Sequence, residues 1–207
     1  MRISVIIPAT ADTIATESTL KTIAAQNDPP HEMLISVPPN HTTALADRFG
    51  ARAVSAAENS LPALLNAGAR AATGDVLLFA CPPAQFPPTA TQAIVRNLSL
   101  LPTTVGGSFH LHFHAPFGTF AAKMAKMMRY RQHYDWDSGI FVRAETFAAL
   151  GGISPADRCG HQFARRMESA GATVYPPDEI LLPAAFILKL MWRWLAVYPF
   201  DTERKSE

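Results

Sequence analysis

The segment LNAGARAATGDVLLFACPPAQFPP, from Leu65 to Pro88, constrains the fold more than any other part of the sequence. Its first half is rich in alanine and predicts a small-residue helix packed on a sheet, which Thr73-Gly74 ends. After Asp75 comes an unbroken apolar run of strand length, Val76 to Phe79. Because a strand with one solvated face alternates apolar and polar residues, this run indicates a strand covered on both faces of an α/β sheet.

The composition limits the class of protein. At 207 residues, 48% hydrophobic and 17% charged, the chain can bury one sizeable core. The net charge of +1 provides no excess of lysine and arginine, so we expect no nucleic-acid partner. The first apolar stretch, Ile3 to Ile7, is too short for a signal peptide, and no run has the length of a clean membrane span. With only Cys81 and Cys159, a reducing cytoplasm is the expected compartment.

Strand and helix signals alternate along the chain, which predicts a mostly parallel sheet. The predicted strands are Ile3 to Ile7, Glu32 to Val37, Ala51 to Val54, Val76 to Phe79, Thr103 to His114, Gly139 to Arg143 and Thr173 to Leu182. The predicted helices are 12–25, 42–49, 61–72, one that starts near Thr89, 117–132, one around 163–167 and an apolar, basic one at 184–200. In the first helix, the predicted inward positions are Ile14, Leu20, Ile23 and Ala24.

Several phrases of the sequence together resemble glycosyltransferase family 2, and most closely its short bacterial members. These phrases are Ile3 to Pro8, Asn66 to Gly68, Ala72 to Asp75 with the apolar strand that follows, Gly139 to Arg143 and Phe147 to Gly152. The resemblance implies a GT-A-like, Rossmann-related α/β fold with a mostly parallel sheet, helices on both faces and a C-terminal helical tail. It places a glycosyltransferase-like domain at 1–183 and the tail at 184–207. The implied function is inverting transfer from a nucleotide sugar to an unknown acceptor.

The resemblance also implies where a nucleotide would be held. In the family, the loop after the first strand cradles the base, and Pro8, Ala9 and Asp12 occupy that loop here. Asn66 and Cys81 are the further nucleotide-binding candidates. Asp12 equally suits a helix cap, so both roles stay open for it.

Three positions depart from the family pattern. The second strand ends in Pro38-Pro39-Asn40 where the family has an aspartate, and Asn40 either substitutes for it or forms a turn. Ala80 to Gln85 contains no carboxylate where the family places its metal-binding aspartates, and Asp75 lies at the other end of that strand. Cys159-Gly160 stands where the family has the Glu-Asp pair that supplies the base. The sequence therefore predicts no conventional Mg²⁺ or Mn²⁺ site and no cofactor, with a nucleotide sugar as the donor substrate.

Two residues are candidates for the missing base. Asp137 matches an acidic residue that precedes the Gly-Ile-Phe-Val-Arg strand in the family, and His161 is an imidazole beside the lost pair. Asp157 is an upstream alternative. If the two acidic motifs of the family meet in space here too, Cys81 and Cys159 would be neighbours near Asp137 and His161, a set suited to a soft metal. The competing interpretation is that lone cysteines are small buried apolar residues.

Two further features leave alternatives open. His110, His112 and His114 alternate along a predicted strand and share one face, either as a metal site or as a solvated polar face. The segment 184–200 combines aromatic and basic residues, and suits either peripheral membrane contact or packing on the core or in a homodimer. For the whole chain, two functions remain: a divergent, metal-independent glycosyltransferase, or a catalytically inactive GT-A-fold binding or scaffold protein.

Overall fold

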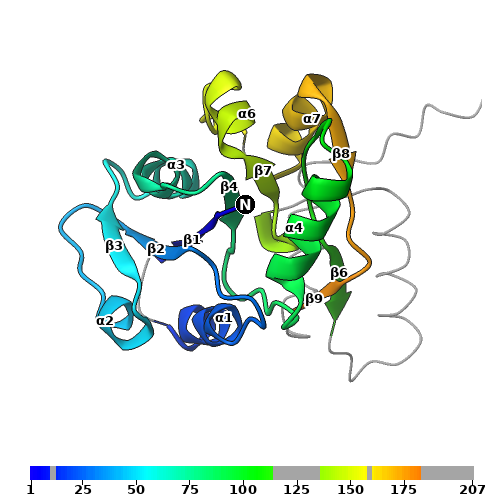
Figure 1. Cartoon of the computed structure of the whole chain (residues 1–207). Helices are drawn as coiled ribbons and strands as arrows, with labels where there is room; N and C mark the ends of the chain where they lie inside the picture. Colours follow the sequence, from blue (N-terminus) through cyan, green and yellow to red (C-terminus); the bar gives the residue numbers. More distant parts are fainter. Residues whose placement is uncertain (10–12, 114–135, 158–159, 183–207) are drawn as a thin grey trace, which may run out of the picture.

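The computed structural model describes residues 1–9, 13–113, 136–157 and 160–182 (Figure 1). The strands are β1 (Ile3–Pro8), β2 (Glu32–Val37), β3 (Arg52–Ser55), β4 (Val76–Phe79), β5 (Thr104–Gly107), β6 (His110–Phe113), β7 (Phe141–Arg143), β8 (Ala172–Val174) and β9 (Glu179–Leu182). The helices are α1 (Ile14–Ala24), α2 (Leu45–Phe49), α3 (Leu61–Ala71), α4 (Ala90–Leu100), α6 (Ala144–Ala149) and α7 (Gly160–Ala170), with a 3-10 turn η1 (Trp136–Ser138).

The main sheet has seven strands in the order β3-β2-β1-β4-β7-β5-β8. Only β7 runs antiparallel to its neighbours, β4 and β5, and the other adjacent pairs are parallel. In the register of the central strands, Val5 of β1 lies between Met33 of β2 and Leu78 of β4. The mostly parallel α/β sheet that the sequence predicts is thereby confirmed.

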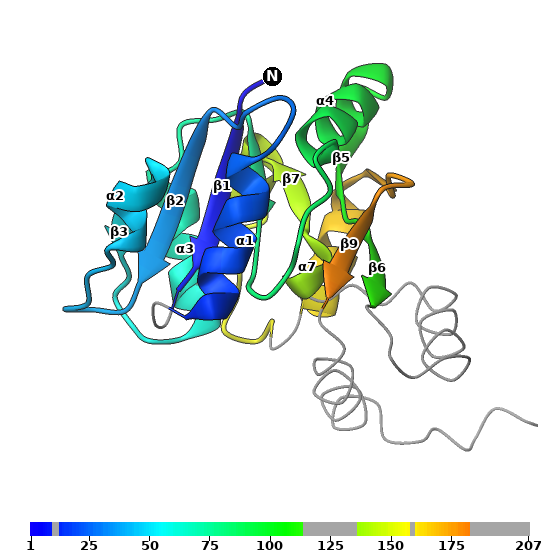
Figure 2. The ribbon, with the colours of Figure 1, turned by 90° about the horizontal axis from the view of Figure 1, so that it is seen from below.

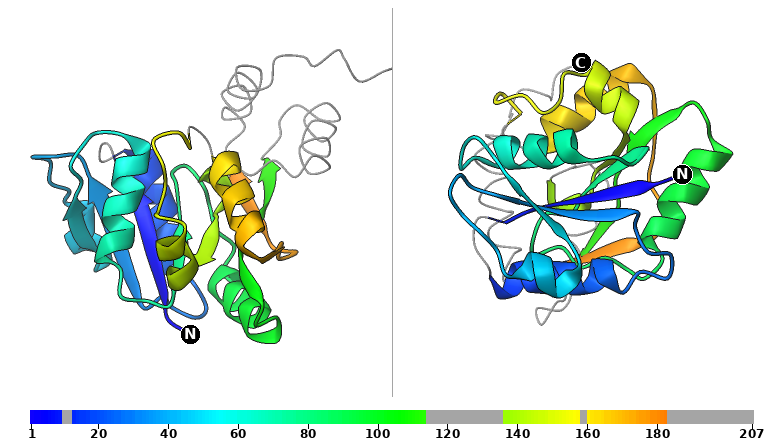
Figure 3. Two further views of the ribbon diagram at one scale, coloured as in Figure 1. Left: turned by 90° about the horizontal axis from the view of Figure 1, so that it is seen from above. Right: turned by 60° about the vertical axis from the view of Figure 1, so that its left-hand side comes forward.

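Helices cover both faces of this sheet. Figure 1 shows α3, α6 and α7 above it and α1 and α2 below it, and the view from above in Figure 3 places α3 in front of β1 and β2. Along β1, the side chains of Ile3, Val5 and Ile7 pack on the lower face, and Ile6 packs on the upper face. This alternation of core contacts explains why apolar residues follow one another along the central strands.

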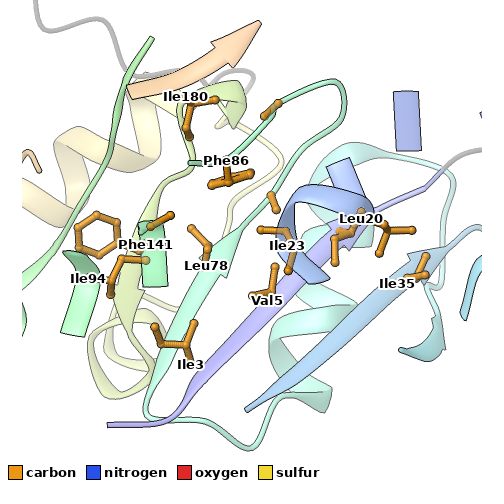
Figure 4. Packing of buried hydrophobic residues seen from close by; sticks show 14 of the residues in the cluster. Ile3, Val5, Leu20, Ile23, Ile35, Leu78, Phe86, Ile94, Phe141 and Ile180 are labelled. Carbon is orange, nitrogen blue, oxygen red and sulfur yellow. The ribbon is translucent and has the colours of Figure 1, made fainter. Parts of the chain in front are cut away.

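The two faces bury separate apolar clusters. The lower cluster joins the sheet to α1, α4 and β9, and Figure 4 shows Leu20, Ile23, Ile94 and Ile180 packed around Val5 and Leu78. The upper cluster joins the sheet to α3, η1, α6 and α7. It contains a group of aromatic side chains, Phe79, Trp136, Phe147 and Phe163.

The predicted inward face of α1 is only half right. Leu20 and Ile23 are fully buried, but Ile14 is 90% exposed and Ala24 is also exposed. The reason is the start of the helix: Thr13 caps it by accepting a hydrogen bond from the Thr16 N–H at 3.2 Å. Ile14 is therefore the first helical residue, at an end of the helix that extends beyond the sheet's apolar cover.

Two predicted strands are each divided between two sheets. The predicted strand Thr103 to His114 forms β5 and β6, and the predicted strand Thr173 to Leu182 forms β8 and β9. In both cases the first half joins the main sheet, and the second half joins a separate two-stranded parallel sheet, β6-β9 (Figure 2). Gly107-Ser108 interrupts the first run and Pro176-Pro177 the second, and glycine and proline are the residues that end or bend strands.

Other predictions fall outside the described residues. These are the helix at 117–132, the tail at 184–207, Asp12, His114 and Cys159. Within the described ranges, no helix combines the length and the apolar character needed to cross a membrane.

Candidate functional site

The carboxyl edge of the main sheet is where this topology can bind a ligand. α1 and α2 lie on one face and α3 on the other, so the order in which strands are added to the sheet reverses between β1 and β4. Ligands of open α/β sheets bind outside the carboxyl ends of the strands at such a point. Pro8 ends β1 there, the Ala9 N–H donates to the Ser36 carbonyl at 2.8 Å, and Cys81 follows β4. Pro8, Ala9 and Cys81 lie at this edge, and all three are buried residues with small side chains.

The end of β2 turns away sharply. The His41 N–H donates to the Pro38 carbonyl at 3.2 Å, and Asn40 takes the left-handed conformation with φ 59°. Asparagine tolerates this region of backbone space better than most residues. Asn40 is therefore a turn residue, as one of its two predicted roles requires.

The loop that follows β4 is held in place by apolar burial and by neighbouring elements. Gln85 exchanges two backbone hydrogen bonds with Leu181 of β9, at 2.9 and 3.0 Å. Its side chain donates to Ser18 Oγ at 3.2 Å, and the Phe86 N–H donates to Thr22 Oγ1 at 3.1 Å, both on α1. The loop is thus fixed between α1 and β9 without any carboxylate in it.

This loop does not suit a conventional divalent metal. Mg²⁺ and Mn²⁺ prefer carboxylate and other hard oxygen ligands, and the side chains of Ala80 to Gln85 supply only one thiol and one amide. Across the described part of the chain, no three histidine, cysteine or acidic side chains gather into a group that could hold a metal. Cys81, Asp137 and His161 therefore do not form the proposed soft-metal set among themselves, and Cys159 lies outside the described residues.

The two candidate bases come from neighbouring elements. Asp137 lies in η1 and is 4% exposed, and His161 is half-buried in the first turn of α7. Trp136 stacks on Phe163 with ring centroids 5.7 Å apart, which holds η1 against α7. The edge of Trp136 also meets Phe79, at the end of β4, with centroids 6.0 Å apart. Aromatic packing therefore places both candidates on the side of β4 that faces α7.

The loop 150–157, between α6 and α7, is clamped to α3. Asn66 donates from Nδ2 to the Ile153 carbonyl at 2.7 Å, and its Oδ1 accepts from the Ile153 N–H at 2.9 Å. Gly152 precedes this contact with φ +75°, and a Cβ there would lie 2.8 Å from Asn66 Oδ1. The structure thus gives Asn66 a structural role, in addition to any contact with a nucleotide.

The same loop is tied to α7 by an ion pair. Arg166 pairs with the buried carboxylate of Asp157 and donates to the carbonyls of Leu150 and Gly152. Asp157 also accepts from the Ser154 N–H at 2.8 Å. Because this carboxylate neutralises a guanidinium and holds the loop, Asp137 and His161 remain the better candidates for a base.

A pocket of about 590 Å³ lies between α3 and this loop. Its volume is in the range of small-molecule sites. It is lined by Ala57, Glu58, Ser60, Leu61, Pro62, Ala63, Asn66, Arg70, Trp136, Ile153, Pro155 and Asp157. Asn66 belongs to this lining, whereas Pro8, Ala9 and Cys81 do not. Sequence reasoning missed Glu58, Arg70 and Trp136, because the pocket depends on the contact between α3 and a loop far along the chain.

The charged network with the strongest electrostatic effect is at the opposite edge. Asp75 pairs with Arg2 at 3.0 Å, and this hydrogen bond holds the pKa of Asp75 below its usual value. Asp75 precedes β4, so it lies far from the carboxyl end of that strand, as predicted. Glu32, at the start of β2, has its pKa lowered to about 2 despite partial burial, because Thr73, Ser4 and Arg52 donate to it.

Comparison with known proteins comes from solved structures. Neither a protein-family model nor a curated protein sequence matches the chain. The mannosyltransferase PcManGT from Pyrobaculum calidifontis, in complex with GDP-Man and Mn²⁺, has 18% identity and a TM-score of 0.63 over 87% of this chain and 56% of that one. S. aureus TarS has 11% identity and a TM-score of 0.69 over 99% of this chain and 67% of that one. M. tuberculosis glucosyl-3-phosphoglycerate synthase has 16% identity and a TM-score of 0.56 over 84% of this chain and 70% of that one.

The chain thus spans 56% to 70% of the length of these three solved chains. At identities this low the likeness concerns the fold. The chain has the GT-A fold that these glycosyltransferases share.

Proposed function

We propose that this chain binds a nucleotide sugar and transfers the sugar to an acceptor with inversion, without a conventional Mg²⁺ or Mn²⁺ site. The observation that carries the proposal is the GT-A sheet, with its topological reversal between β1 and β4 at a small-residue edge. Solved structures with this fold include PcManGT in complex with GDP-Man and TarS in complex with UDP-GlcNAc. A fold alone does not fix a function, so the residues of the edge have to support it.

The nucleotide would lie over Pro8, Ala9 and Cys81, with Asp12 and Asn66 as the polar candidates around it. Small buried residues at the ends of β1 and β4 let a planar base and a diphosphate approach the backbone closely. The loop after β4 offers no carboxylate for the metal that relatives with this fold hold, as PcManGT does with Mn²⁺. Binding by this chain is therefore expected to be independent of divalent cations.

The transfer step needs one proton acceptor. The acceptor hydroxyl attacks the anomeric carbon of the sugar, its proton passes to the base, and the bond from that carbon to the diphosphate breaks with its electron pair leaving on the diphosphate oxygen. Asp137 and His161 are the candidate bases, and both come from elements packed together beside the end of β4. In-line attack on one face of the sugar inverts its configuration.

Calorimetric titration of the full chain with UDP, GDP, UDP-GlcNAc and GDP-Man tests the binding half of the proposal. Each titration is run in EDTA and again in excess Mn²⁺. We expect at least one nucleotide to bind with the same affinity under both conditions. Affinity that appears only with Mn²⁺ would contradict the metal-independent site.

Release of free nucleotide from the best donor tests the catalytic half, with water as the acceptor when no other is known. Asp137→Asn and His161→Gln are compared with matched changes at exposed positions, Asp47→Asn and His41→Gln. The variant that loses release by about a hundredfold or more, while it still binds the nucleotide, identifies the base. If all four variants release nucleotide like the parent, neither residue is the base.

A second function is favoured by the missing carboxylates. A GT-A domain that lacks the acidic residues at the ends of β2 and β4 can serve as a binding or scaffold protein without catalysis. The same titrations separate the two functions, because a scaffold of this kind would bind none of the four nucleotides.

We place the protein in the cytoplasm and propose that 184–200, which lies outside the described residues, contacts a membrane surface or a second copy. Co-sedimentation with anionic vesicles and sedimentation velocity distinguish those two contacts.

A further inference from the structure

We infer that the pocket between α3 and the loop 150–157 binds an elongated amphiphilic anion, with its anionic group at Arg70 and a hydroxyl group near Glu58. In identifying this ligand as the acceptor, the inference rests on the proposed function. The pocket lies beside the nucleotide edge and shares only Asn66 with the described nucleotide candidates, since Pro8, Ala9 and Cys81 do not line it.

The walls of the pocket are already fixed without a ligand. Asn66 holds Ile153 through two hydrogen bonds, and Arg166 anchors the other end of the loop through Asp157. On the facing side, Ser60 caps α3 by accepting from the Ala63 N–H at 3.3 Å. Because these contacts already hold the walls in place, little protein conformational entropy is lost when a ligand binds there.

The lining combines apolar side chains with three charged residues, Glu58, Arg70 and Asp157. Leu61, Pro62, Ile153, Pro155 and Trp136 supply apolar surface.

Arg70 and Glu58 are the charges available to a ligand. Within the ranges that the structure describes, neither side chain makes a hydrogen bond or an ion pair, and both are exposed. The third charged residue of the lining, Asp157, is neutralised by Arg166. One cation and one anion are thus free to bind opposite ends of a molecule.

The helix sets the distance between these two charges. Glu58 precedes the cap of α3, whereas Arg70 is in its last turn, on the same side as Ala63 and Asn66. The ten residues from Ser60 to Arg70 correspond to about 15 Å of helix. A ligand that reaches both groups is therefore elongated, with an apolar body lying against Pro62 and Ile153.

This arrangement orients the ligand relative to the donor edge. The Glu58 end is at the carboxyl end of β3, on the edge where the nucleotide is expected, and the Arg70 end is toward the opposite edge. The hydroxyl end of the ligand thus faces the donor edge, and its anionic end is anchored away from it.

The test is a ligand-observed NMR titration of the full chain with ω-hydroxyoctanoate and with octanediol, which has the same body without the charge. We expect the acid to bind about tenfold more tightly than the diol, as a single charge-assisted contact predicts. Arg70→Gln should remove that difference, and Arg165→Gln, a change to an exposed arginine of α7 outside the pocket, should keep it. Equal binding of the acid and the diol, or an unchanged preference in Arg70→Gln, overturns the inference.

Two additions make the result specific. Ala63→Leu narrows the pocket and should weaken binding of both probes, and binding that is unchanged would place the probes elsewhere. UDP at saturation should leave the affinity for the acid unchanged, whereas displacement of the acid by UDP would show that the two share one site and would overturn the inference. If UDP does not bind at all, the proposed function fails, and the pocket is still judged by Arg70→Gln alone.

Discussion

Replacing Glu32 by glutamine should destabilise the fold by an amount that depends on pH. The Glu32 carboxylate lies at the start of β2 and accepts four hydrogen bonds: from Ser4 Oγ at 2.7 Å, from the Thr73 N–H at 2.6 Å, from Thr73 Oγ1 at 2.8 Å and from Arg52 Nη2 at 3.1 Å. These donors belong to β1, to the turn before β4 and to β3. One carboxylate therefore joins the amino ends of four neighbouring strands.

The magnitude follows from the pKa of this carboxyl group. Burial alone would raise the pKa of Glu32, but the hydrogen bonds from Thr73, Ser4 and Arg52 outweigh it and lower the pKa from 4.5 to about 2. Such a fall corresponds to about 3 kcal/mol of folded-state stability, at about 1.4 kcal/mol per pH unit. Because the side chain is 18% exposed and solvent weakens its ion pair with Arg52, we expect about 2 kcal/mol to be measured.

The sign of the pH dependence is fixed by the direction of the shift. A carboxyl group whose pKa is lowered by folding stabilises the protein fully above its unfolded pKa, and that contribution disappears as the pH falls toward the folded value. Urea unfolding of the parent and of Glu32→Gln should therefore differ by about 2 kcal/mol at pH 7 and converge between about pH 4.5 and pH 2. Glu145→Gln, at an exposed position in the first turn of α6, should change the free energy of unfolding by less than about 0.5 kcal/mol. A Glu32→Gln deficit that stays constant from pH 7 to pH 2 would refute the electrostatic account.

Three further changes test other parts of the structure. Gly107→Ala should lower the free energy of unfolding by more than about 3 kcal/mol or prevent folding, because a Cβ there would lie 1.8 Å from the Val174 carbonyl oxygen across the β5–β8 pair. A thermal melt close to that of the parent would contradict this packing. Arg166→Lys should lower the free energy of unfolding by about 2 kcal/mol, since an ammonium group cannot reach two carbonyls and Asp157 in the planar geometry of a guanidinium, and an unchanged urea midpoint would argue against the clamp. Saturating Mn²⁺ should leave the Tm unchanged, because residues 80–85 supply no carboxylate, and a Tm that rises with Mn²⁺ concentration would reveal a site elsewhere.

Local signals predicted the central half of the fold well. The apolar run Val76 to Phe79 and the β-branched run that starts at Ile3 are strands in the structure, and both are buried on two faces. The predicted helix 61–72 is α3, Leu61–Ala71, and the structure shows that it begins at a serine cap with a proline in its first turn. These elements carry their own start and stop residues, so each could be located without knowledge of its neighbours.

The errors occurred where tertiary contacts decide the structure. Nothing in the run from Thr103 to His114 shows that its second half pairs with β9, because the pairing partner is far along the chain. Ile14 was predicted to be buried from its spacing alone, and the cap at Thr13 determines that it is exposed. Periodicity describes one helix face, but it does not say where along the helix the packed surface ends.

The candidate site was predicted only in part, for a related reason. Pro8, Ala9 and Cys81 could be placed at the carboxyl edge because each follows a strand that the sequence makes evident. The two hydrogen bonds between Asn66 and Ile153 could not be predicted from the sequence, since they join a residue of α3 to a residue of a loop after α6. The pocket beside them exists only because these two distant segments are adjacent.

The bridge between Gln85 and Leu181 also sets an order of events during synthesis. β1 to β4 pair with one another in the order β3-β2-β1-β4, so they can associate before the C-terminal strands have been synthesised. The loop after β4 has no backbone partner of this kind until β9 has been made near the end of the described chain. A nascent chain that stops before β9 would thus contain all seven strands of the main sheet while the loop after β4 still lacks this partner, and the ligand edge takes its final form only when the last strand is added.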